Sequence, residues 1–290
     1  MRVEKFEVDK EIKLSSFLAI RLSNISVSVL KSALKNKDIK VDGVRVKNDV
    51  ILTPGQVVEI YLQDKYFEID IEILYQDENI VVVNKPQGIE TVNEFGSGLK
   101  EFVEKKIGLK IFAVHRLDRN TGGLVVFAKN EQAKNELDDA FKNRTIDKFY
   151  LTLVYGTPFS EKAELVAYLK KDDKQSRVYV IDDNQAGYEK IQTNYRVIQK
   201  CDNASLLEVK LVTGKTHQIR AHLAHVGNFV IGDEKYGDSK INKFFKKKKQ
   251  CLWAYKIKFN IKEGLLKYLD EKIIELDKDK IDFVKNCNNL

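Results

Sequence analysis

The densest group of residues that could do chemistry lies at 114–129, VHRLDRNTGGLVVFAK, where charged side chains come directly before a glycine pair and an apolar run. Asp118 stands between Arg116 and Arg119, and neighbouring positive charges favour the ionised form of a carboxyl group. An ionised carboxylate suits a nucleophile better than a general acid, and the glycines permit a close approach of the backbone to another group. The same residues could also form a purely structural, salt-bridged turn. The residue types alone favour the nucleophile and the structural turn about equally.

A second polar segment, 211–227, contains Gly214-Lys215-Thr216, which looks like the end of a phosphate-binding loop. The complete loop requires another glycine five positions before the second one, and Val209 stands there. The sequence therefore excludes ATP or GTP binding by this motif. Arg220 lies further along the same segment, and its planar guanidinium could pair with a carboxylate or a phosphate.

His217, His222 and His225 also lie in this segment, but only the last two share a face of the predicted helix. No cysteine or carboxylate nearby completes a set of metal ligands. The chain also lacks the motifs C-x-x-C, H-E-x-x-H, G-x-S-x-G and G-x-G-x-x-G. We therefore expect neither a metal nor a cofactor.

The elements that would position these segments fall into two groups along the chain. The first sixty residues predict helices at 12–22 and 27–34, a hairpin at 39–46 and a strand at 57–62. The remainder predicts strands at 80–84, 124–129, 149–155, 206–212 and 253–259, and helices near 130–142, 216–226 and 264–285. Because short connections join the strands, we expect an α+β protein whose larger part holds a mixed, mostly antiparallel sheet.

The 290 residues are enough for about two domains, and a hydrophobic fraction of 43% excludes wholesale disorder. Lys and Arg number 50 against 43 Asp and Glu, and a basic excess favours an acidic partner such as nucleic acid. No apolar run reaches the roughly 18 residues of a membrane span, and the N-terminal residues lack the apolar core of a secretory signal. We therefore expect a cytoplasmic protein without a membrane partner.

Four ordered motifs resemble those of the RluA family of pseudouridine synthases, in the RluC/RluD-type branch that carries an N-terminal S4 RNA-binding domain. They are His115–Gly123 (HRLDRNTGG), Lys148–Gly156 (KFYLTLVYG), Thr213–Arg220 (TGKTHQIR) and Leu252–Ala254 (LWA). Residues 11–62 resemble the S4 module, and residues 71–88 resemble the opening motif of the catalytic part. The resemblance thus covers nearly the whole chain.

This resemblance implies a small S4-like RNA-binding domain at residues 1–65 and a pseudouridine synthase catalytic domain at residues 66–290. The enzyme would be an isomerase that breaks the N1–C1′ bond of a uridine and rejoins the uracil through C5. Asp118 would be the catalytic nucleophile and would start the reaction by attack at C1′ or C6, or by removing a 2′ proton. The sequence leaves these three routes open.

Four further residues are implied to bind the target uridine, which must leave its base stack to reach the site. Arg220 would hold Asp118 ionised and oriented. Tyr150 would stack on the uracil, and its hydroxyl could assist proton transfer at C5. Arg116 would fill the gap left by the flipped base, and Leu252 would line the uracil pocket.

Lysines and arginines of the S4-like part and of a later lysine run are predicted to contact phosphates. They are Arg21, Lys31, Lys35, Lys40, Arg45, Lys47, Lys246, Lys247 and Lys248. Large-subunit (23S) ribosomal RNA is the expected target, with transfer RNA as the alternative, and the protein is expected to be a monomer. A non-catalytic S4-type RNA-binding or ribosome-assembly protein is the second hypothesis. A glycoside hydrolase is a third, but the sequence offers no second carboxylate beside Asp118.

Overall fold

The computed structural model describes residues 2–22, 25, 27–63, 69–93 and 98–285. The chain divides into two compact units, Met1–Ile71 with Gly88–Leu109, and Glu72–Gln87 with Lys110–Leu290. The domain boundary predicted at residues 65/66 falls outside the described residues and stays a prediction. None of the described helices combines the length and the apolar character that a membrane crossing requires.

The first unit holds a small antiparallel sheet and three helices. Its elements are β1 (Arg2–Glu7), β2 (Ile12–Lys13), α1 (Leu14–Arg21), α2 (Val27–Lys35), β3 (Ile39–Val41), β4 (Val44–Val46), β5 (Ile51–Leu52), β6 (Val57–Leu62) and α3 (Leu99–Ile107). The main sheet has the order β1-β6-β3-β4, and β2 pairs with β5. The predicted hairpin is confirmed: Asp42 and Gly43 both have positive φ, as a type I′ turn requires. β1 was not predicted, because its residues are exposed or half-buried and show no apolar periodicity.

The second unit is built around one eleven-stranded sheet with few helices. Its strands are β7 (Glu72–Gln76), β8 (Ile80–Lys85), β9 (Phe112–Ala113), β10 (Gly122–Ala128), β11 (Ile146–Tyr155), β12 (Lys162–Asp172), β13 (Arg177–Ile181), β14 (Glu189–Cys201), β15 (Ala204–Leu211), β16 (Leu252–Phe259) and β17 (Ile273–Glu275). The order is β13-β12-β14-β15-β11-β16-β10-β8-β7, with β17 on β16 and β9 on β10. Among the described strands of this sheet only the β10–β16 pair is parallel, so the predicted mixed, mostly antiparallel sheet is confirmed.

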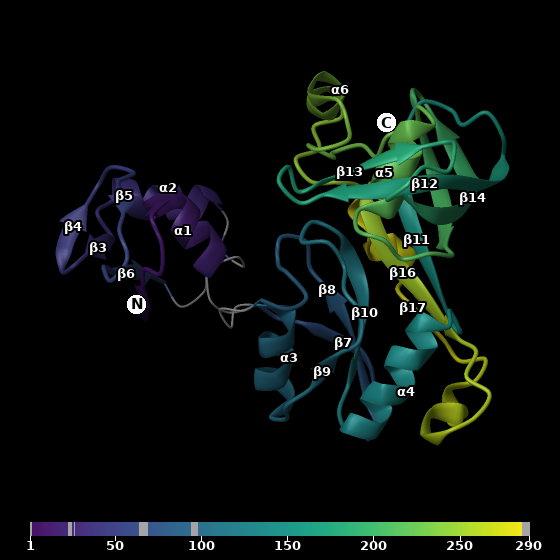
Figure 1. Cartoon of the computed structure of the whole chain (residues 1–290), viewed down its shortest axis with the longest axis horizontal. Coiled ribbons are helices and arrows are strands. Elements are labelled where there is room, and N and C mark those ends of the chain that lie inside the picture. Colours follow the sequence, from purple (N-terminus) through teal and green to yellow (C-terminus); the bar gives the residue numbers. More distant parts are fainter. Residues whose placement is uncertain (1, 23–24, 26, 64–68, 94–97, 286–290) are drawn as a thin grey trace. The chain divides into compact units, whose positions relative to one another are not determined.

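Two helices cover this sheet where the chemistry was predicted. α4 (Glu131–Lys142) begins at Asn130, whose side chain accepts a hydrogen bond from the backbone N–H of Ala133, and it packs against β10. α5 (Gln218–His225) packs against β12, β13 and β14 (Figure 1). Both helices match the predicted ranges to within two residues.

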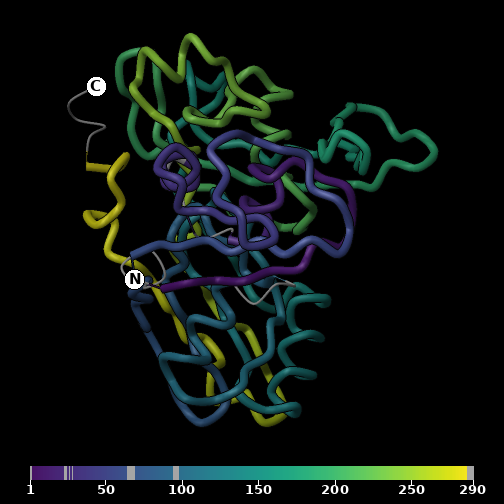
Figure 2. Tube along the Cα trace, turned by 90° about the vertical axis from the view of Figure 1, so that its left-hand side faces the viewer, coloured from purple at the N-terminus to yellow at the C-terminus, as the bar shows by residue number. Residues whose placement is uncertain are grey.

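β16 comes from the C-terminal part of the chain and lies between β11 and β10 (Figure 2, yellow among blue and teal). At the parallel pair, Gly123 lies opposite Ala254 with φ of 114°, and a Cβ at Gly123 would lie 2.1 Å from the Ala254 carbonyl oxygen. The close backbone approach predicted from the glycine pair is therefore confirmed. It allows the segment that carries Asp118 to enter the sheet beside β16.

The C-terminal helix predicted near 264–285 is wrong. That stretch holds two 3₁₀ turns (Leu265–Leu269 and Lys278–Lys280), the strand β17 and the short helix α7 (Asp282–Lys285). Glu271 has positive φ, which ends any helix there, and β17 pairs with β16. Strands β12, β13 and β14 were also missed, because one face of this hairpin system is exposed and its charged residues hide the alternation.

Candidate active site

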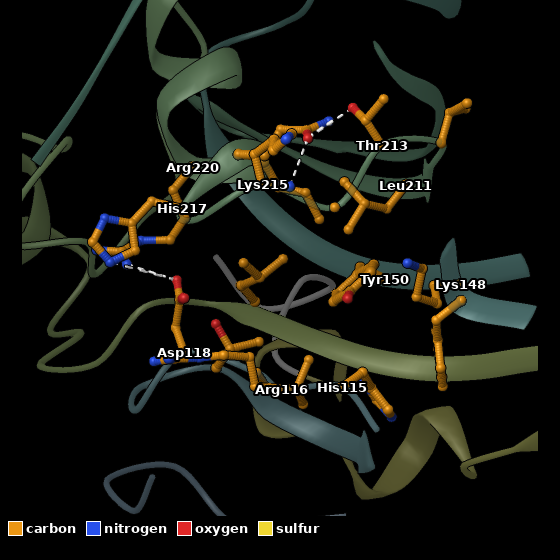
Figure 3. Close-up of a pocket in the computed structure, with 18 of the residues that line it drawn as sticks. His115, Arg116, Asp118, Lys148, Tyr150, Leu211, Thr213, Lys215, His217 and Arg220 are labelled. Atoms are coloured by element: carbon orange, nitrogen blue, oxygen red, sulfur yellow. Dashed lines mark hydrogen bonds and ion pairs between the residues drawn. The ribbon is translucent and has the colours of Figure 1, made fainter. Parts of the chain in front are cut away.

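A cavity of about 470 Å³ opens in the second unit, between the loop ahead of β10, the strand β11 and the start of α5 (Figure 3). All five residues predicted to act on the substrate line it: Arg116, Asp118, Tyr150, Arg220 and Leu252. They come from four separate segments, so the fold brings them together. Asp118 points from one wall toward His217 and Arg220 on the opposite wall.

Asp118 lies in a tight turn that is tied to the sheet. The backbone N–H of Thr121 donates to the carbonyl of Asp118 over 3.0 Å. The hydroxyl of Thr121 accepts from Nε2 of Gln250, which is buried just ahead of β16. Because the turn is closed and its Thr121 end is held, the carboxylate of Asp118 is presented to the cavity with 23% of its side chain exposed.

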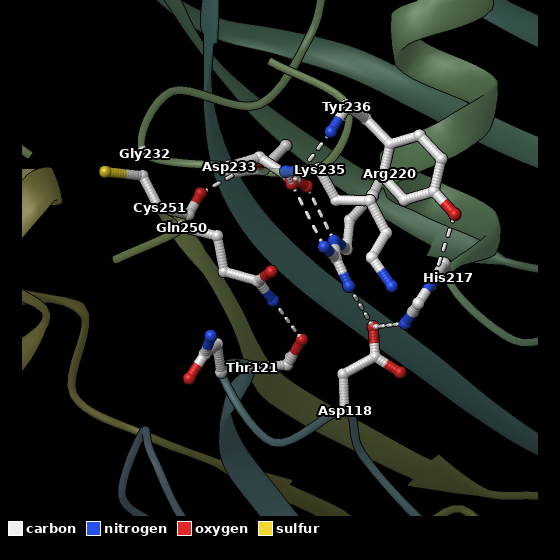
Figure 4. Close-up of polar contacts among 12 residues, drawn as sticks. Asp118, Thr121, His217, Arg220, Gly232, Asp233, Lys235, Tyr236, Gln250 and Cys251 are labelled. Carbon is white, nitrogen blue, oxygen red and sulfur yellow. Dashed lines mark hydrogen bonds and ion pairs between the residues drawn. The ribbon is translucent and has the colours of Figure 1, made fainter. Parts of the chain in front are cut away.

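Arg220 binds two carboxylates at once (Figure 4). Its Nη1 donates to Oδ2 of Asp118 over 2.9 Å, while its Nε and Nη2 donate to the two oxygens of Asp233 over 2.6 and 3.0 Å. Asp233 is fully buried and also accepts from the backbone N–H groups of Lys235 and Tyr236. The guanidinium is thus fixed from behind, and one nitrogen remains for Asp118.

The electrostatics of this trio keep the guanidinium charged. Burial alone would lower the pKa of Arg220, but the bonds with Asp233, and then the charge of Asp118, raise it above its usual value. Likewise, burial alone would raise the pKa of Asp233, but Arg220 holds it below its usual range. The fold therefore supplies a second carboxylate that the sequence did not reveal, yet its oxygens are taken up by Arg220. It is not available as the second acid that a glycoside hydrolase needs.

His217 also faces Asp118, with Nε2 3.9 Å from Oδ2. Its Nδ1 lies 2.9 Å from the hydroxyl of Tyr236, which itself accepts from the backbone N–H of Val178. Burial lowers the pKa of His217, and the charge of Asp118 only partly offsets this. His217 adopts a positive φ of 53°, an unfavourable conformation for a residue with a Cβ, which concentrates at functional sites.

Tyr150 reaches the cavity from β11 at an irregularity of the sheet. Phe149 pairs with Lys256 and Tyr150 with Ala254, so Tyr255 is an extra residue of β16. Such bulges re-aim side chains and are frequent beside active sites. Tyr150 is 6% exposed, and burial, followed by the charge of Asp118, raises the pKa of its phenol.

The far end of the cavity carries Lys148 and His115. Lys148 lies over the ring of Phe141 at 5.6 Å, and burial lowers the pKa of its amine. Nε2 of His115 accepts from the backbone N–H of Val126 over 2.9 Å, and burial lowers the pKa of this imidazole to about 3. His115 is therefore neutral at physiological pH and fixes the strand β10 rather than exchanging protons.

The three histidines of the second polar segment have separate partners. His222 contacts Thr193, and His225 contacts Asp182, while His217 contacts Tyr236. Within the described parts of the chain, no group of three His, Cys, Asp or Glu side chains is arranged to hold a metal ion.

Sequence reasoning missed Asp233, His217 and Tyr236 as site residues. His217 stands three positions before Arg220 in the TGKTHQIR motif, so its place one turn ahead of Arg220 was available as a signal. Asp233 and Tyr236 gave no comparable signal, because only the fold brings their loop beneath α5.

The predicted RNA contacts of the first unit lie at or near its surface. Lys31, Lys35, Arg45 and Lys47 are exposed, and Lys40 is half-buried. Lys40 and Arg45 lie over the ring of Tyr61 at 5.1 and 5.6 Å, a combination of cations and an aromatic ring that suits nucleic acid. Arg21 is half-buried, with its guanidinium over Phe17, so part of its side chain serves the unit itself.

The predicted lysine contacts of the second unit follow α6 (Ser239–Phe244). Lys246 is exposed, Lys247 is half-buried, and Lys248 lines a second cavity beside the first. Of the two aromatic residues nearby, Phe244 is 69% exposed while Phe245 belongs to the core.

The site of the second unit thus presents the carboxylate of Asp118, held by the buried Arg220, to a cavity that four segments of the chain line. A model of the RNA pseudouridylate synthase family matches residues 79–225. A ribosomal large subunit pseudouridine synthase C of Vibrio cholerae is 30% identical over 84% of this chain and 83% of that protein. An uncharacterised RNA pseudouridine synthase of Mycoplasma capricolum is 30% identical over 94% and 96% of the two chains. The structure of human RNA pseudouridylate synthase domain containing 1 shares the fold, with a TM-score of 0.58 and 21% identity over 76% of this chain and 96% of that chain.

The chain therefore belongs to the RNA pseudouridylate synthase family, in its RluA-type branch. It is an RNA-modifying isomerase, and the resemblance to the RluA family is confirmed, while the S4 domain stays a prediction.

Proposed function

We propose that this enzyme converts uridines of large-subunit ribosomal RNA to pseudouridine, with Asp118 as the catalytic nucleophile. The observation that carries the proposal is the 2.9 Å hydrogen bond from Arg220 to Asp118 inside a cavity that also holds Tyr150 and Leu252. The ribosomal target is supported by the names of relatives such as the Vibrio cholerae protein. Because these relatives are bacterial, we retain the cytoplasm as the expected compartment.

The reaction breaks the N1–C1′ bond, forms a C5–C1′ bond and releases the proton of C5, while N1 takes up a proton in its place. Each of the three possible openings, at C1′, at C6 or at the 2′ proton, uses an ionised carboxylate oxygen. Arg220 supplies a fixed positive charge at Oδ2 and leaves Oδ1 of Asp118 for the substrate. Tyr150 enters with a neutral phenol, which can stack on the uracil and donate or relay a proton.

We further propose that residues 1–65 form an S4-like RNA-binding domain and that the enzyme acts as a monomer. The exposed cations of α2 and of the β3–β4 hairpin support the first point, because they would neutralise phosphates without reading sequence. Arg116, at the rim of the cavity, has the planar group that stacks on bases, which suits it to replace the flipped uracil.

Tritium release from RNA labelled at uracil C5 tests the proposal, because joining the sugar at C5 expels that hydrogen. The RNA is taken from cells that lack this protein and is separated into ribosomal and transfer RNA. We expect release from ribosomal RNA by the wild type and none by Asp118→Asn. Release from transfer RNA alone would favour the alternative target. If tritium were released neither from naked RNA nor from assembling large subunits, the result would favour a non-catalytic RNA-binding protein.

A further inference from the structure

A second cavity, of about 450 Å³, adjoins the active site, and Arg220 forms part of the wall of both. Asn120, two residues after Asp118, lines this second cavity as well. We propose that it binds the phosphodiester of a nucleotide that neighbours the target uridine. The proposal rests on the function proposed above and assigns a part of its RNA site.

Three cations converge on this cavity from separate segments of the chain. Arg177 begins β13, Lys235 follows the buried Asp233, and Lys248 belongs to the lysine run after α6. Glu234 is the single carboxylate among the lining residues. The cavity therefore carries an excess of positive charge that attracts an anion.

These three cations have no direct acidic partner in the described parts of the chain. Among the described residues, none of the three forms an ion pair with an acidic side chain, whereas Lys215 in the first cavity is paired with Glu189. Burial, and then the charge of Arg220, lowers the pKa of Lys235, and the charges of Asp118 and Asp233 offset this only in part. A phosphate would relieve this crowding of positive charge.

Two of the cations are held in place before any ligand arrives. The guanidinium of Arg177 lies 5.1 Å from the ring centre of Tyr236, and Nζ of Lys235 donates to the carbonyl of Ser176. Figure 4 shows Lys235 and Tyr236 close to Arg220. Such pre-arranged donors bind an anion with little loss of side-chain freedom.

The position of the cavity favours RNA as the source of the phosphate. A uridine seated against Asp118 continues into its neighbours, and the cavity wall shared through Arg220 lies directly beside that seat. The amides of Asn120 and Gln175 also line the cavity and offer donors and acceptors for a ribose or a base. A volume of about 450 Å³ lies within the usual range for small-ligand sites.

The test compares charge removal on the protein with charge removal on the RNA. The protein variants are Arg177→Ala with Lys248→Ala, the charge-conserving pair Arg177→Lys with Lys248→Arg, and the control Lys267→Ala, an exposed lysine away from both cavities. The probe is a short synthetic RNA with one central uridine, which fixes the register. A second version carries a neutral methylphosphonate at the linkage next to that uridine.

We expect the double alanine variant to bind the normal RNA more weakly by a factor of about ten or more. The slope of the logarithm of the binding constant against the logarithm of the salt concentration should fall in magnitude by about 1 to 2. The wild type should lose a similar factor on the methylphosphonate RNA, and the double variant should lose nothing further. The charge-conserving pair should bind nearly as the wild type does, which separates charge from a folding defect. The Lys267→Ala control should leave both RNAs unaffected.

The inference would be overturned if the double alanine variant bound the normal RNA as tightly as the wild type does. It would also be overturned if the methylphosphonate lowered the affinity of the wild type and of the double variant by the same factor. Competition by inorganic phosphate as strong as that by the RNA would assign the cavity to a free anion instead. Tritium release from ribosomal RNA is measured in parallel. If tritium is released but the variants bind RNA as the wild type does, the role of this cavity is rejected and the proposed function stands. If no tritium is released but binding depends on charge as expected, the proposed function is rejected and the role of the cavity stands.

Discussion

Nη1 of Arg220 donates to Oδ2 of Asp118 over 2.9 Å and so joins the turn ahead of β10 to helix α5, 102 residues further along the chain. Arg220 can bind both carboxylates because a guanidinium is planar and its three nitrogens donate in fixed directions. Two of its nitrogens are used by Asp233 and one is left for Asp118. This contact orients the predicted nucleophile and keeps a positive charge beside it.

Arg220→Lys should abolish most of the activity while the protein still folds. A lysine has one nitrogen and cannot hold Asp118 and Asp233 in the same plane, so the charge remains but the orientation is lost. We expect the single-turnover rate to fall by about 10²–10³-fold with little change in RNA affinity. Rates are measured by tritium release. If Arg220→Lys reacted at the wild-type rate, the simultaneous contacts of the guanidinium with Asp118 and Asp233 would not be needed for catalysis.

Asp233→Asn should damage stability as well as rate. The amide cannot balance the buried guanidinium, which keeps only the partly exposed Asp118 as a charged partner, and breaking a buried ion pair costs about 3–5 kcal/mol of the free energy of unfolding. Urea unfolding measures this loss. Asp182→Asn is a matched control, because that carboxylate is 82% exposed and pairs with His225 at the surface, where changes stay within about 0.5 kcal/mol. Similar losses in both variants would contradict the role assigned to Asp233.

Much of this site could be predicted from the sequence, because its motifs sit on elements with clear patterns. The glycine pair, the apolar run of β10 and the capped helix α4 are local features, and the structure confirms them. Asp233 could not be predicted, because its role depends on a turn beneath α5 that no local pattern encodes. The arginines beside Asp118 in the sequence did not identify its partner either: Arg116 lines the cavity, but Asp118 forms its ion pair with Arg220.

Tyr150→Phe should separate the stacking role of the ring from that of the hydroxyl. The phenylalanine keeps the volume of a buried side chain, so we expect wild-type stability and near-normal RNA affinity. If the hydroxyl assists proton transfer at C5, the rate falls by about 10²-fold, the usual contribution of acid–base catalysis. An unchanged rate would assign the residue to stacking alone.

The pH profile gives an independent check on Tyr150. Burial and the charge of Asp118 raise the pKa of its phenol above its ordinary value of 10.0. The hydroxyl therefore stays protonated across the whole range in which RNA is handled, and the wild-type rate should show no alkaline decline from this group up to about pH 9. A decline near pH 8 that disappears in Tyr150→Phe would contradict this.

Glu208 should make the second unit sensitive to acid. Its carboxylate accepts from Nε and Nη2 of Arg196 over 2.8 and 3.2 Å and from the hydroxyl of Tyr255. Burial alone would raise the pKa of Glu208, but these hydrogen bonds outweigh it and lower the pKa to about 2. A carboxyl group whose pKa is lowered on folding adds stability above its unfolded pKa, and this is lost as pH falls through the folded value.

Glu208→Gln should therefore unfold about 1–3 kcal/mol more easily than the wild type at neutral pH. The difference should hold above about pH 5 and shrink as pH falls from 4.5 toward about 2. Urea unfolding across this range measures it. A difference that stays constant down to pH 3 would show that the carboxylate is not held ionised by its neighbours.

The glycine pair that opens β10 should respond differently at its two positions. A Cβ at Gly122 would lie 2.4 Å from the indole of Trp253, which is a side chain. A Cβ at Gly123 would lie 2.1 Å from the carbonyl oxygen of Ala254, and φ there is 114°. Side chains can move and backbone cannot, so Gly123→Ala should cost more stability than Gly122→Ala, by about 1–3 kcal/mol.

Trp253→Leu provides the decisive comparison. Removing the indole opens the space beside Gly122 but leaves the backbone of Ala254 where it is, so the smaller side chain should relieve Gly122→Ala and not Gly123→Ala. In double-mutant cycles we expect a favourable interaction energy of about 1–2 kcal/mol for the first pair and close to zero for the second. Because the turn that carries Asp118 ends at these glycines, tritium release should recover together with stability in the rescued variant. Equal rescue of both glycine variants would mean that the backbone of β16 can move, and that its close approach to β10 is not what fixes the position of Asp118.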